Sequence, residues 1–277
     1  MQELPLISCL TVTANRLTML KEAMACFAAQ TYPNREMVIA VTGSERYYNA
    51  ILDHLDHLGS SDIRLVRADG GAPLGAVRNL TMDAARGSYF CQWDDDDLYH
   101  PERLRLQYEA LHSAGADASF LTDLLQFYAD ELVLYWLDWS LFAPRGADKG
   151  MVPMSILVRR DSRLRYPESG SDARWGEDNA FRSQVFVHLH PVGLSGHGYL
   201  YVYRYHGRNI YGREHHQILT GLAMEPDSIR CRMHQLRRAL AGLPLPLPYA
   251  VRGRNGEAVF LYNGPVPADS AGETNWP

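Results

Sequence analysis

The sequence predicts an α/β fold: a mainly parallel β-sheet flanked by helices, followed by a C-terminal helix and β-hairpin. Apolar segments with little polar alternation recur through the first 100 residues, and amphipathic helical patterns separate them. Near the C-terminus, an Asn-Gly pair lies between two strand-like segments, which is a strong hairpin signal. A chain of 277 residues can bury a large core, so one main domain with an appendage is expected.

The first part of the chain alternates predicted strands and helices. The strand signals are residues 6–13, 36–42, 63–66 and 88–93. Helical spacing of apolar residues follows the first three strands, at Leu20, Ala23, Met24 and Phe27, at Tyr48, Ile51, Leu52 and Leu55, and at Ala76, Val77, Leu80 and Ala84. Ser44 suits the start of the second helix, and Gly59 and Gly87 suit the ends of the second and third.

The second part predicts one more helix and then strands around an aromatic segment. Pro101 suits the first turn of a helix with Leu104, Tyr108 and Leu111 on one face, which ends at Gly115. Residues 132–142 are expected to line a cleft, 151–160 and 198–207 to form strands, and 174–186 to enter a helix. Asp227 is expected to cap a helix that ends at Gly242, and Asn255-Gly256 to turn the hairpin.

The composition limits the partners and the compartment. A net charge of -5 and a pI near 6.1 give no overall positive surface for nucleic acid. The four cysteines have no metal-ligand spacing, so buried free thiols are expected at Cys9, Cys26, Cys91 and Cys231. No apolar segment is long enough to span a membrane, which predicts a cytoplasmic protein and leaves peripheral membrane association open.

Four successive aspartates, residues 94–97, directly follow the fourth predicted strand. On extended backbone, Asp94 and Asp96 share one face, while Asp95 and Asp97 point elsewhere. Two carboxylates on one face suit Mg2+ or Mn2+, which usually keep other positions for water and substrate phosphates. The alternative is a solvated acidic loop that stabilises the start of the next helix.

Three segments, taken together, match a known family. They are residues 10–41 (LTVTANRLTMLKEAMACFAAQTYPNREMVIAV), 70–104 (GGAPLGAVRNLTMDAARGSYFCQWDDDDLYHPERL) and 174–181 (RWGEDNAF). They resemble the family 2 glycosyltransferases of the GT-A fold, over about residues 6–210. The resemblance implies transfer of a sugar from a nucleotide-diphosphate sugar, with UDP-sugar favoured, to a hydroxyl of a glycan, a lipid-linked or a small-molecule acceptor.

The resemblance also implies a division of the chain. Residues 1–213 would form the glycosyltransferase domain, with a donor half at about 1–100 and an acceptor half at about 101–213. Residues 214–264 would form the helical and hairpin extension, and residues 265–277 are expected to be disordered.

The acidic run is the metal site that the resemblance implies. Asp94 and Asp96 match the two acids of the family's DxD motif, and Asp97 matches the acid that often follows it. Asp96 is expected to bind Mn2+ or Mg2+, Asp94 to contact ribose or a metal-bound water, and Asp95 to lie in the donor site. An ion on the diphosphate would neutralise the charge that grows on the leaving group. His206 is expected as a further ligand, with a structural histidine as an equal alternative.

The Glu177-Asp178 pair is the implied catalytic element. A sugar hydroxyl attacks efficiently only when a carboxylate takes its proton. Family members use the aspartate of this pair as the base, which implies that Asp178 is the base and that the anomeric configuration inverts. The alternative is a pair of acids that only stabilises the start of a helix.

Further donor contacts are implied at the ends of two elements. The family's donor loop after the first strand is matched by Thr13, Ala14, Asn15 and Arg16. Arg78 would contact a phosphate or brace the acidic run, and an internal ion pair to Asp94 or Asp97 is an equal alternative. Arg204, Arg208 and Arg213 would contact phosphate or be surface charges, and His215-His216 would be a solvated helix start.

The sequence departs from the family after the second strand. Most members carry an acid there that reads the nucleobase, whereas this chain has Thr42-Gly43-Ser44. A hydroxyl at this place or Glu45 would substitute, so the donor base stays open, with GDP and TDP beside UDP. Trp136, Trp139 and Trp175 would form the acceptor floor, because aromatic rings pack on the C-H faces of sugars, or would belong to the core.

Two other classes of protein remain as alternatives. A metal-dependent nucleotidyltransferase would also need a parallel sheet and acidic metal ligands, but it usually has a Gly-rich basic loop early in the chain, which residues 11–16 (TVTANR) are not. A degenerate glycan- or nucleotide-binding module without transferase activity is supported only by the missing acid after the second strand.

Overall fold

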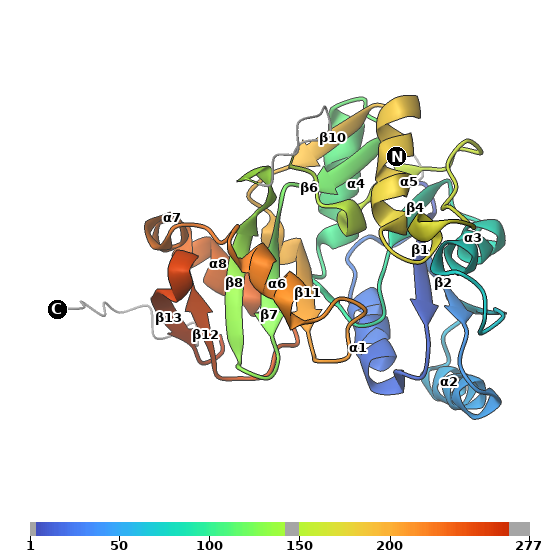
Figure 1. The fold of residues 1–277 in the computed structure, drawn as a ribbon, viewed down its shortest axis with the longest axis horizontal. Coiled ribbons are helices and arrows are strands. Elements are labelled where there is room, and N and C mark those ends of the chain that lie inside the picture. The colour runs from blue at the N-terminus through green and yellow to red at the C-terminus, as the bar shows by residue number, and fades with distance from the viewer. Residues whose placement is uncertain (1–3, 142–149, 266–277) are drawn as a thin grey trace.

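The computed structural model describes residues 4–141 and 150–265, and these parts contain two β-sheets (Figure 1). The first sheet has the strand order β10-β6-β9-β4-β1-β2-β3, and the second has the order β13-β12-β8-β7-β11-β5. The first sheet consists of β1 (Ile7–Thr13), β2 (Arg35–Val41), β3 (Ile63–Arg67), β4 (Tyr89–Gln92), β6 (Ala118–Leu121), β9 (Leu157–Arg159) and β10 (Pro191–Leu194). Within it, only β9 runs antiparallel to its neighbours among the described strands, so the predicted mainly parallel sheet is confirmed.

Helices cover both faces of the first sheet, and the residues of its central strands explain why. Cys9, Met37 and Ile39 belong to one apolar core with α1 (Leu17–Ala28), α2 (Glu45–Leu58) and α4 (Arg103–Ser113). Their strand neighbours Leu10 and Val38 belong to a second core with α3 (Leu74–Ala84) and α5 (Glu177–His188). Because alternate side chains of a strand point to opposite faces, both faces must be covered, which is typical of parallel sheets.

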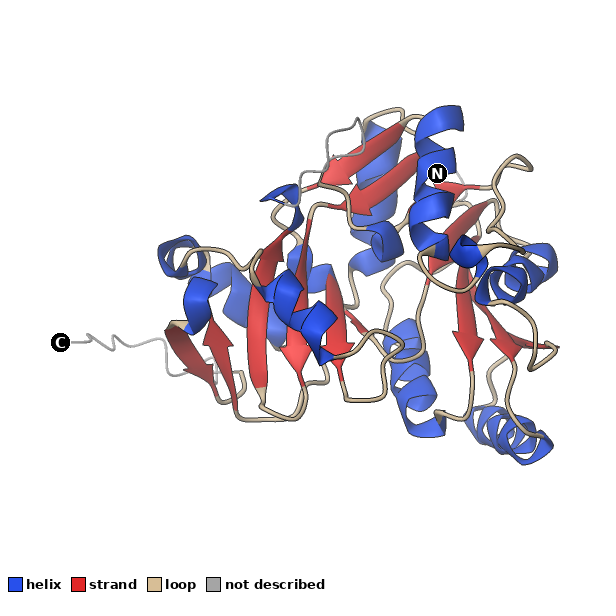
Figure 2. Cartoon of the chain, viewed as in Figure 1, coloured by secondary structure: helices blue, strands red, loops and turns tan. Residues whose placement is uncertain are grey.

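The second sheet is mixed and lies beside the first (Figure 2). It consists of β5 (Leu98–Tyr99), β7 (Asp123–Tyr128), β8 (Val133–Asp138), β11 (Tyr201–Tyr205), β12 (Tyr249–Arg252) and β13 (Ala258–Tyr262). The chain after β11 forms α6 (Arg213–Thr220), α7 (Pro226–Cys231) and α8 (Met233–Leu240). The hairpin turn at Asn255, with φ of 58°, connects β12 and β13 as predicted. β12 also pairs in parallel with β8, so the C-terminal hairpin continues the second sheet.

The predicted boundaries of α2 are confirmed. For α3, the predicted inner face and the predicted end both differ from the structure. The Ser44 side chain accepts a hydrogen bond from the Tyr47 backbone N–H, and Gly59 ends α2 with a left-handed φ of 60°. In α3, by contrast, Leu80 is exposed while Arg78 and Asn79 are buried. This helix presents polar side chains to the interior because, as described below, they have buried partners. It ends at Ala84, ahead of the predicted Gly87.

Several predictions for the second part need correction. The predicted strand at 151–160 is reduced to β9, because a short 3-10 helix (Pro153–Ser155) precedes it. Asp227 lies inside α7 and caps nothing, and the predicted helix divides into α7 and α8 at Arg232. Cys231 is exposed, whereas the other three cysteines are buried as predicted. No helix in the described ranges has the length and apolar composition to span a membrane.

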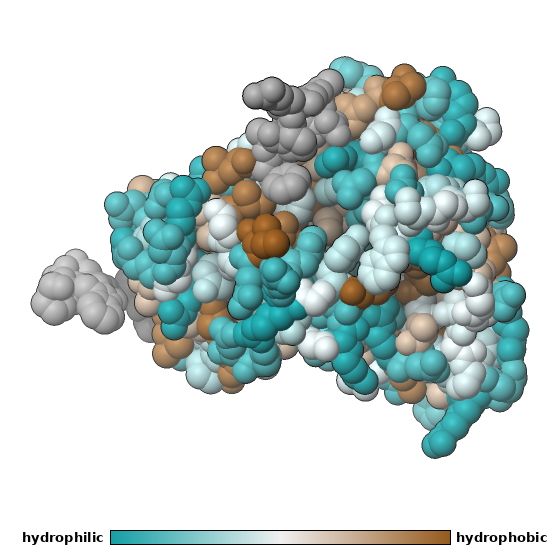
Figure 3. Space-filling model, in the orientation of Figure 1, coloured by the Kyte–Doolittle hydropathy of each residue, from teal (hydrophilic) through white to brown (hydrophobic). Residues whose placement is uncertain are grey.

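Some predictions concern residues outside the described ranges. Residues 266–277, predicted to be disordered with Pro265, lie outside the described residues, as does Phe142 at the end of the aromatic segment. The face shown in Figure 3 is mainly hydrophilic, and its apolar atoms occur in separate spots.

Candidate active site

A cavity of about 680 Å3 lies beyond the carboxyl ends of β1, β2 and β4. Most of its wall comes from the turn after β1, the start of α3, the acidic run, the start of α5 and the segment around β11, which are far apart in sequence. The carboxyl edge of a parallel sheet is where such folds bind ligands. Predicted site residues that line the cavity are Thr13, Ala14, Asn15, Arg16, Arg78, Asp94, Asp95, Asp96, Trp175, Glu177 and Asp178.

The carboxylates of the acidic run differ in exposure. The side chains of Asp94 and Asp96 are 20% and 15% exposed, whereas the Asp95 side chain is 1% exposed and Asp97 is 2% exposed. Asp94 and Asp96 therefore form the more accessible pair, as predicted, although Asp95 and Asp96 lie in a turn after β4 and not on the extended backbone that the prediction assumed.

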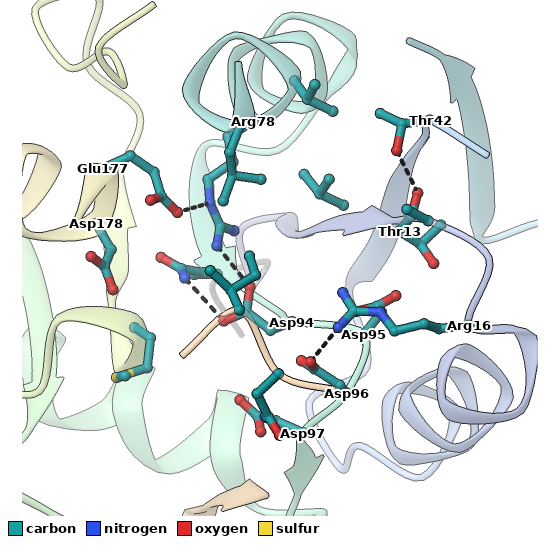
Figure 4. A pocket seen from close by; sticks show the side chains of 18 of the residues that line it. Thr13, Arg16, Thr42, Arg78, Asp94, Asp95, Asp96, Asp97, Glu177 and Asp178 are labelled. Atoms are coloured by element: carbon teal, nitrogen blue, oxygen red, sulfur yellow. Dashed lines mark hydrogen bonds and ion pairs between the residues drawn. The ribbon is translucent and has the colours of Figure 1, made fainter. Parts of the chain in front are cut away.

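Each carboxylate of the run has a polar partner, which explains why four adjacent acids are tolerated (Figure 4). The partners are Arg78 Nη2 at 3.0 Å from Asp94 Oδ1, Arg16 Nη2 at 2.7 Å from Asp95 Oδ1, Arg16 Nη1 at 2.5 Å from Asp96 Oδ2, and the Tyr201 hydroxyl, which donates to Asp97 Oδ2 at 2.5 Å. A fully buried arginine, Arg103, lies over the rings of Tyr99 and Tyr201 and adds positive charge behind the run.

Burial and neighbouring charges shift the pKa values of Asp95, Asp96 and Asp97 in different directions. Burial, together with the charge of Asp96, raises the pKa of Asp95 to about 7. Burial also raises the pKa of Asp97 well above its ordinary value, and the charges of Asp96 and Asp94 add to this. Burial acts on Asp96 too, but the hydrogen bond with His206 and the charge of Arg16 outweigh it, so the pKa of Asp96 is lowered. Of these three acids, Asp96 is the one whose charged form its neighbours stabilise.

Arg78 connects the acidic run to the Glu177-Asp178 pair. Its Nε lies 2.9 Å from Glu177 Oε1 while its Nη2 contacts Asp94, and the arginine is buried in α3. The expected ion pair to Asp94 is thus present, and Glu177 is a second partner that the sequence did not indicate. Burial, followed by the charge of Glu177, raises the pKa of Asp178 to about 6. Asp178 lies beside Glu177 and faces the same cavity (Figure 4).

His206 approaches the acidic run from the end of β11. Its Nε2 is 3.2 Å from Asp96 Oδ2, and its side chain is 5% exposed. No cluster of three or more histidine, cysteine or acidic side chains forms a complete metal site within the described ranges. Asp96 and His206 nevertheless supply a carboxylate oxygen and an imidazole nitrogen at one place, a donor set that fits Mn2+ when other ligands come from substrate and water.

The donor-loop side of the cavity contains hydroxyls and no carboxylate from the second strand. Thr42 lines the cavity and donates its hydroxyl to the Thr13 carbonyl oxygen at 3.2 Å. Gly43 is required there by close packing, since a Cβ atom would lie 2.3 Å from the Tyr47 ring. Glu45 is not in the cavity lining; it forms an exposed ion pair with Arg67. The hydroxyl of Thr42 is therefore the candidate substitute for the missing acid.

Two predicted acceptor residues are in the core instead. Trp136 is fully buried and its indole N–H donates to Asp123 at 2.6 Å, while Trp139 is 6% exposed. Because neither lines the cavity, the acceptor-floor prediction is wrong for both. Trp175 is 57% exposed, lines the cavity and packs edge-on against Tyr211.

The structure also shows which histidines and arginines near β11 are buried, which line the cavity and which lie at the surface. His216 is fully buried beside Gln126 and stacks on Tyr203, so the prediction of a solvated helix start is wrong. Arg208 lines the cavity. Arg213 pairs with Asp130 and Glu131 at the surface and is not part of the cavity lining.

Sequence reasoning missed part of the cavity wall. The additional lining residues include Gly70, Ala72, Leu74, Met154, Arg174, Tyr203, Asn209, Ile210 and Tyr211. The Gly-Gly-Ala-Pro stretch at 70–73 carried a signal, because a Gly- and Pro-rich turn that enters a helix beyond a strand end lies at the ligand-binding edge. Of the others, Leu74 begins α3 and Tyr203 belongs to β11, whereas Arg174, Asn209, Ile210 and Tyr211 lie in irregular segments without a periodic pattern.

The comparison with known families decides the assignment. Residues 8–147 match the family described as glycosyl transferase family 2. The chain belongs to glycosyl transferase family 2. Among curated members, the putative colanic acid biosynthesis glycosyl transferase WcaA of Escherichia coli (strain K12) is 32% identical over 104 residues, 38% of this chain and 37% of WcaA. An uncharacterized glycosyltransferase of Rickettsia prowazekii (strain Madrid E), RP339, is 29% identical over 108 residues, 39% of this chain and 32% of that protein. The chain thus matches about a third of these relatives' length.

Solved glycosyltransferases share the fold at low sequence identity. S. aureus TarS 1-349 in complex with UDP-GlcNAc superposes with a TM-score of 0.59 over 88% of this chain and 68% of the TarS 1-349 chain, at 14% identity. The mannosyltransferase PcManGT from Pyrobaculum calidifontis, in complex with GDP-Man and Mn2+, superposes with a TM-score of 0.56 over 85% of this chain and 65% of PcManGT, at 10% identity. These likenesses confirm the predicted GT-A fold of this family 2 member.

Proposed function

We propose that the protein is an inverting, metal-dependent glycosyltransferase that moves a sugar from a nucleotide-diphosphate sugar to an acceptor hydroxyl. The observation that carries this proposal is the position of Arg78, which joins Asp94 to Glu177. Through this bridge, the acidic run and the Glu177-Asp178 pair form opposite walls of one cavity. One wall suits a diphosphate with its metal ion, and the other suits a hydroxyl that must lose a proton.

Asp178 is the proposed general base. Because burial and Glu177 raise its pKa to about 6, it is ionised at neutral pH and more basic than an ordinary aspartate. Glu177 is held by Arg78 and thus positions the start of α5. A base on the side of the acceptor, with the leaving diphosphate on the other side, favours direct displacement and inversion. Asp178 then takes the acceptor proton as the acceptor oxygen replaces the diphosphate at the anomeric carbon.

Asp96 and His206 are the proposed metal ligands, with Asp94 beside them. A carboxylate oxygen and an imidazole nitrogen together suit Mn2+, and Mg2+ is the other candidate. When bound, the ion would neutralise charge on the leaving diphosphate. The neighbour PcManGT was solved with GDP-Man and Mn2+, which supports a divalent ion in this fold.

A UDP-sugar is the proposed donor. TarS, one of the structural neighbours, was solved with UDP-GlcNAc, whereas PcManGT was solved with GDP-Man, so both bases occur on this fold. Thr42 is the proposed base-reading residue, with Thr13 beside it. Trp175 and Tyr211 are proposed to contact the acceptor, because their rings lie at the cavity on the side of Asp178 and are 57% and 37% exposed.

The deciding experiment combines nucleotide binding with product analysis. Thermal-shift titration with UDP, GDP, TDP and CDP, each with and without Mn2+, identifies the nucleotide, since a ligand of the native state raises the melting temperature. Donor sugars of the selected nucleotide are then incubated with hydroxyl acceptors, and the anomeric configuration of the product is determined by NMR.

Each outcome of that experiment separates the competing functions. A manganese-dependent shift followed by an inverted product supports the proposed function. Retained configuration would exclude single displacement with Asp178 as the base. Pyrophosphate release from a nucleoside triphosphate would instead indicate a nucleotidyltransferase, and a shift without any product would indicate a binding module.

A further inference from the structure

Arg16 is the residue directly before α1, in the turn that follows β1. Its guanidinium spans two carboxylates, with Nη2 at 2.7 Å from Asp95 Oδ1 and Nη1 at 2.5 Å from Asp96 Oδ2 (Figure 4). The Arg16 side chain is 21% exposed and that of Asp95 is 1% exposed, so water screens these contacts less than it screens a surface ion pair.

The topology of the sheet fixes this contact. β1 and β4 are adjacent and parallel, so the residues after both strands meet at the same edge. Asn15 adopts a left-handed conformation, with φ of 52°, and its Oδ1 accepts a hydrogen bond from the Ser44 backbone N–H at 3.4 Å. This turn directs the next residue, Arg16, across the acidic run. A salt bridge therefore forms between segments about 80 residues apart.

The Arg16 guanidinium contacts the same oxygen of Asp96 that would bind the proposed metal ion. Asp96 Oδ2 is the atom that faces His206 Nε2 at 3.2 Å, and it is also the atom that Arg16 Nη1 contacts. A divalent ion binds a carboxylate oxygen at about 2.0–2.2 Å, and a positive guanidinium against the same oxygen opposes it by charge and by volume. Arg16 and a metal ion therefore compete for Asp96.

Nothing else in the described parts of the chain holds the guanidinium in place. Its only ion-pair and side-chain hydrogen-bond partners there are Asp95 and Asp96. A guanidinium displaced from these acids would still face the cavity, which Arg16 lines. Planar guanidinium groups bind phosphate oxygens through two parallel hydrogen bonds, so a diphosphate is a suitable second partner.

We propose that Arg16 is a resident counter-cation that excludes divalent ions from Asp96 until a nucleoside diphosphate binds and takes the guanidinium. This inference rests on the proposed function of the cavity. Since a ligand that removes Arg16 from Asp96 makes metal binding easier, metal and nucleotide must each raise the affinity of the other. The protein then takes up its metal together with the donor.

The test is a titration with Mn2+ alone, followed by the EPR signal of free Mn2+, on three proteins. They are the wild type, Arg16→Met and Arg105→Met. Arg105 is the matched control because its guanidinium also bridges two carboxylates, Glu102 and Glu109, but it lies outside the cavity. Without nucleotide, Arg16→Met is expected to bind Mn2+ at least about tenfold more tightly than the wild type. Arg105→Met is expected to match the wild type.

The same titration with UDP or GDP present measures the coupling. In the wild type, the nucleotide that binds should raise Mn2+ affinity at least about tenfold, and in Arg16→Met this gain should be much smaller. Equal Mn2+ affinity of wild type and Arg16→Met without nucleotide would overturn the inference. Wild type that binds Mn2+ as tightly alone as with nucleotide would also overturn it, and that result needs no variant to fold.

Failure of the proposed function gives a different result. A protein that transfers no sugar would still show the Arg16-dependent change in affinity for Mn2+ alone. The melting temperature of each variant, measured beside the titration, confirms that the variants are folded.

Discussion

Two groups of carboxylates face the cavity, and they are stabilised in different ways. In the acidic run, Asp94, Asp95 and Asp96 each contact a guanidinium. On the opposite wall, Arg78 contacts Glu177, whereas the only hydrogen bond of the Asp178 carboxylate in the described residues comes from the Asn179 backbone N–H at 2.8 Å. The adjacent acids Glu177 and Asp178 thus differ, because Glu177 has an ion-pair partner among the described residues and Asp178 has none.

This difference supports the proposal that one cavity binds the donor diphosphate and also contains a base. In the acidic run, His206 and Arg16 lower the pKa of Asp96, whereas burial outweighs the contact with Arg16 at Asp95 and raises its pKa to about 7. A buried carboxylate without a direct cation keeps a higher pKa and suits proton transfer near neutral pH. If the two walls have these separate roles, substitutions on them should affect different steps.

The largest expected effect comes from Asp178→Asn. Loss of a general base should lower kcat by about a thousandfold, because such catalysis contributes roughly 10²- to 10⁴-fold. The nucleotide-induced thermal shift should stay within error, since the opposite wall is unchanged. Asp172→Asn, an exposed acid outside the cavity lining, is the matched control. Near-normal kcat in Asp178→Asn would show that the base lies elsewhere.

Arg78→Met should give the second largest effect, because it breaks the bridge between the walls. Two acids lose their shared cation, so the free energy of unfolding should fall by about 3 kcal/mol in urea titration. The Arg78 charge lowers the pKa of Asp178, so its loss should move the acid limb of the pH-rate profile to higher pH. Arg86→Met removes an equal charge from an ion pair with Glu36 that lies outside the cavity lining, and it should leave the profile in place. If the acid limb of the pH-rate profile is the same in Arg78→Met as in the wild type, the charge of Arg78 does not influence the pKa of Asp178.

The wild-type pH profile is a smaller effect that tests the base directly. The base must be ionised, and its pKa is about 6. Below pH 6 the protonated fraction grows, so kcat should fall roughly tenfold per pH unit, and above pH 7 it should level off. A rate that is constant between pH 4.5 and 8 would argue against a titrating base with this pKa.

The smallest expected effect is at the acceptor side. Trp175→Ala should raise the acceptor KM by roughly three- to tenfold with little change in kcat, because it removes one stacking surface. Trp136→Phe should instead lower the melting temperature without changing KM, since the buried Asp123 loses its 2.6 Å hydrogen bond from the indole. Equal KM values for wild type and Trp175→Ala would remove this tryptophan from the acceptor site.

The sequence was sufficient to predict β1 to β4 of the first sheet and most of the acidic wall, whereas β6 and β10 were not predicted. The helical spacing of apolar residues and the capping residues Ser44 and Gly59 predicted α2. The acidic run was expected at the ligand site because it follows the carboxyl end of a parallel strand, and it does line the cavity. The accessible pair, Asp94 and Asp96, was also predicted, but its basis was not, because the run forms a turn and not an extended strand. These features depend on local spacing, which a sequence records directly.

Contacts that depend on the packing of distant segments were not predictable. The polar inner face of α3 exists because Arg78 meets Glu177 and because the Asn79 amide donates to the Tyr166 carbonyl oxygen at 2.9 Å. The burial of Trp136 depends on Asp123, a partner on the neighbouring strand. An aromatic residue suits both a core and a sugar-binding surface, so composition alone could not separate them.

The parallel pairing of β12 with β8 has a consequence for any shortened form of the protein. The family match ends at residue 147, and the glycosyltransferase domain predicted from sequence ends at residue 213. A chain cut at either place would lose β12, the neighbour that covers one side of β8. The backbone donors and acceptors of β8, along with the buried face of its apolar residues, would become an open strand edge, which invites association between molecules. The C-terminal hairpin thus keeps β8 in the interior of the sheet and makes β13 the edge strand.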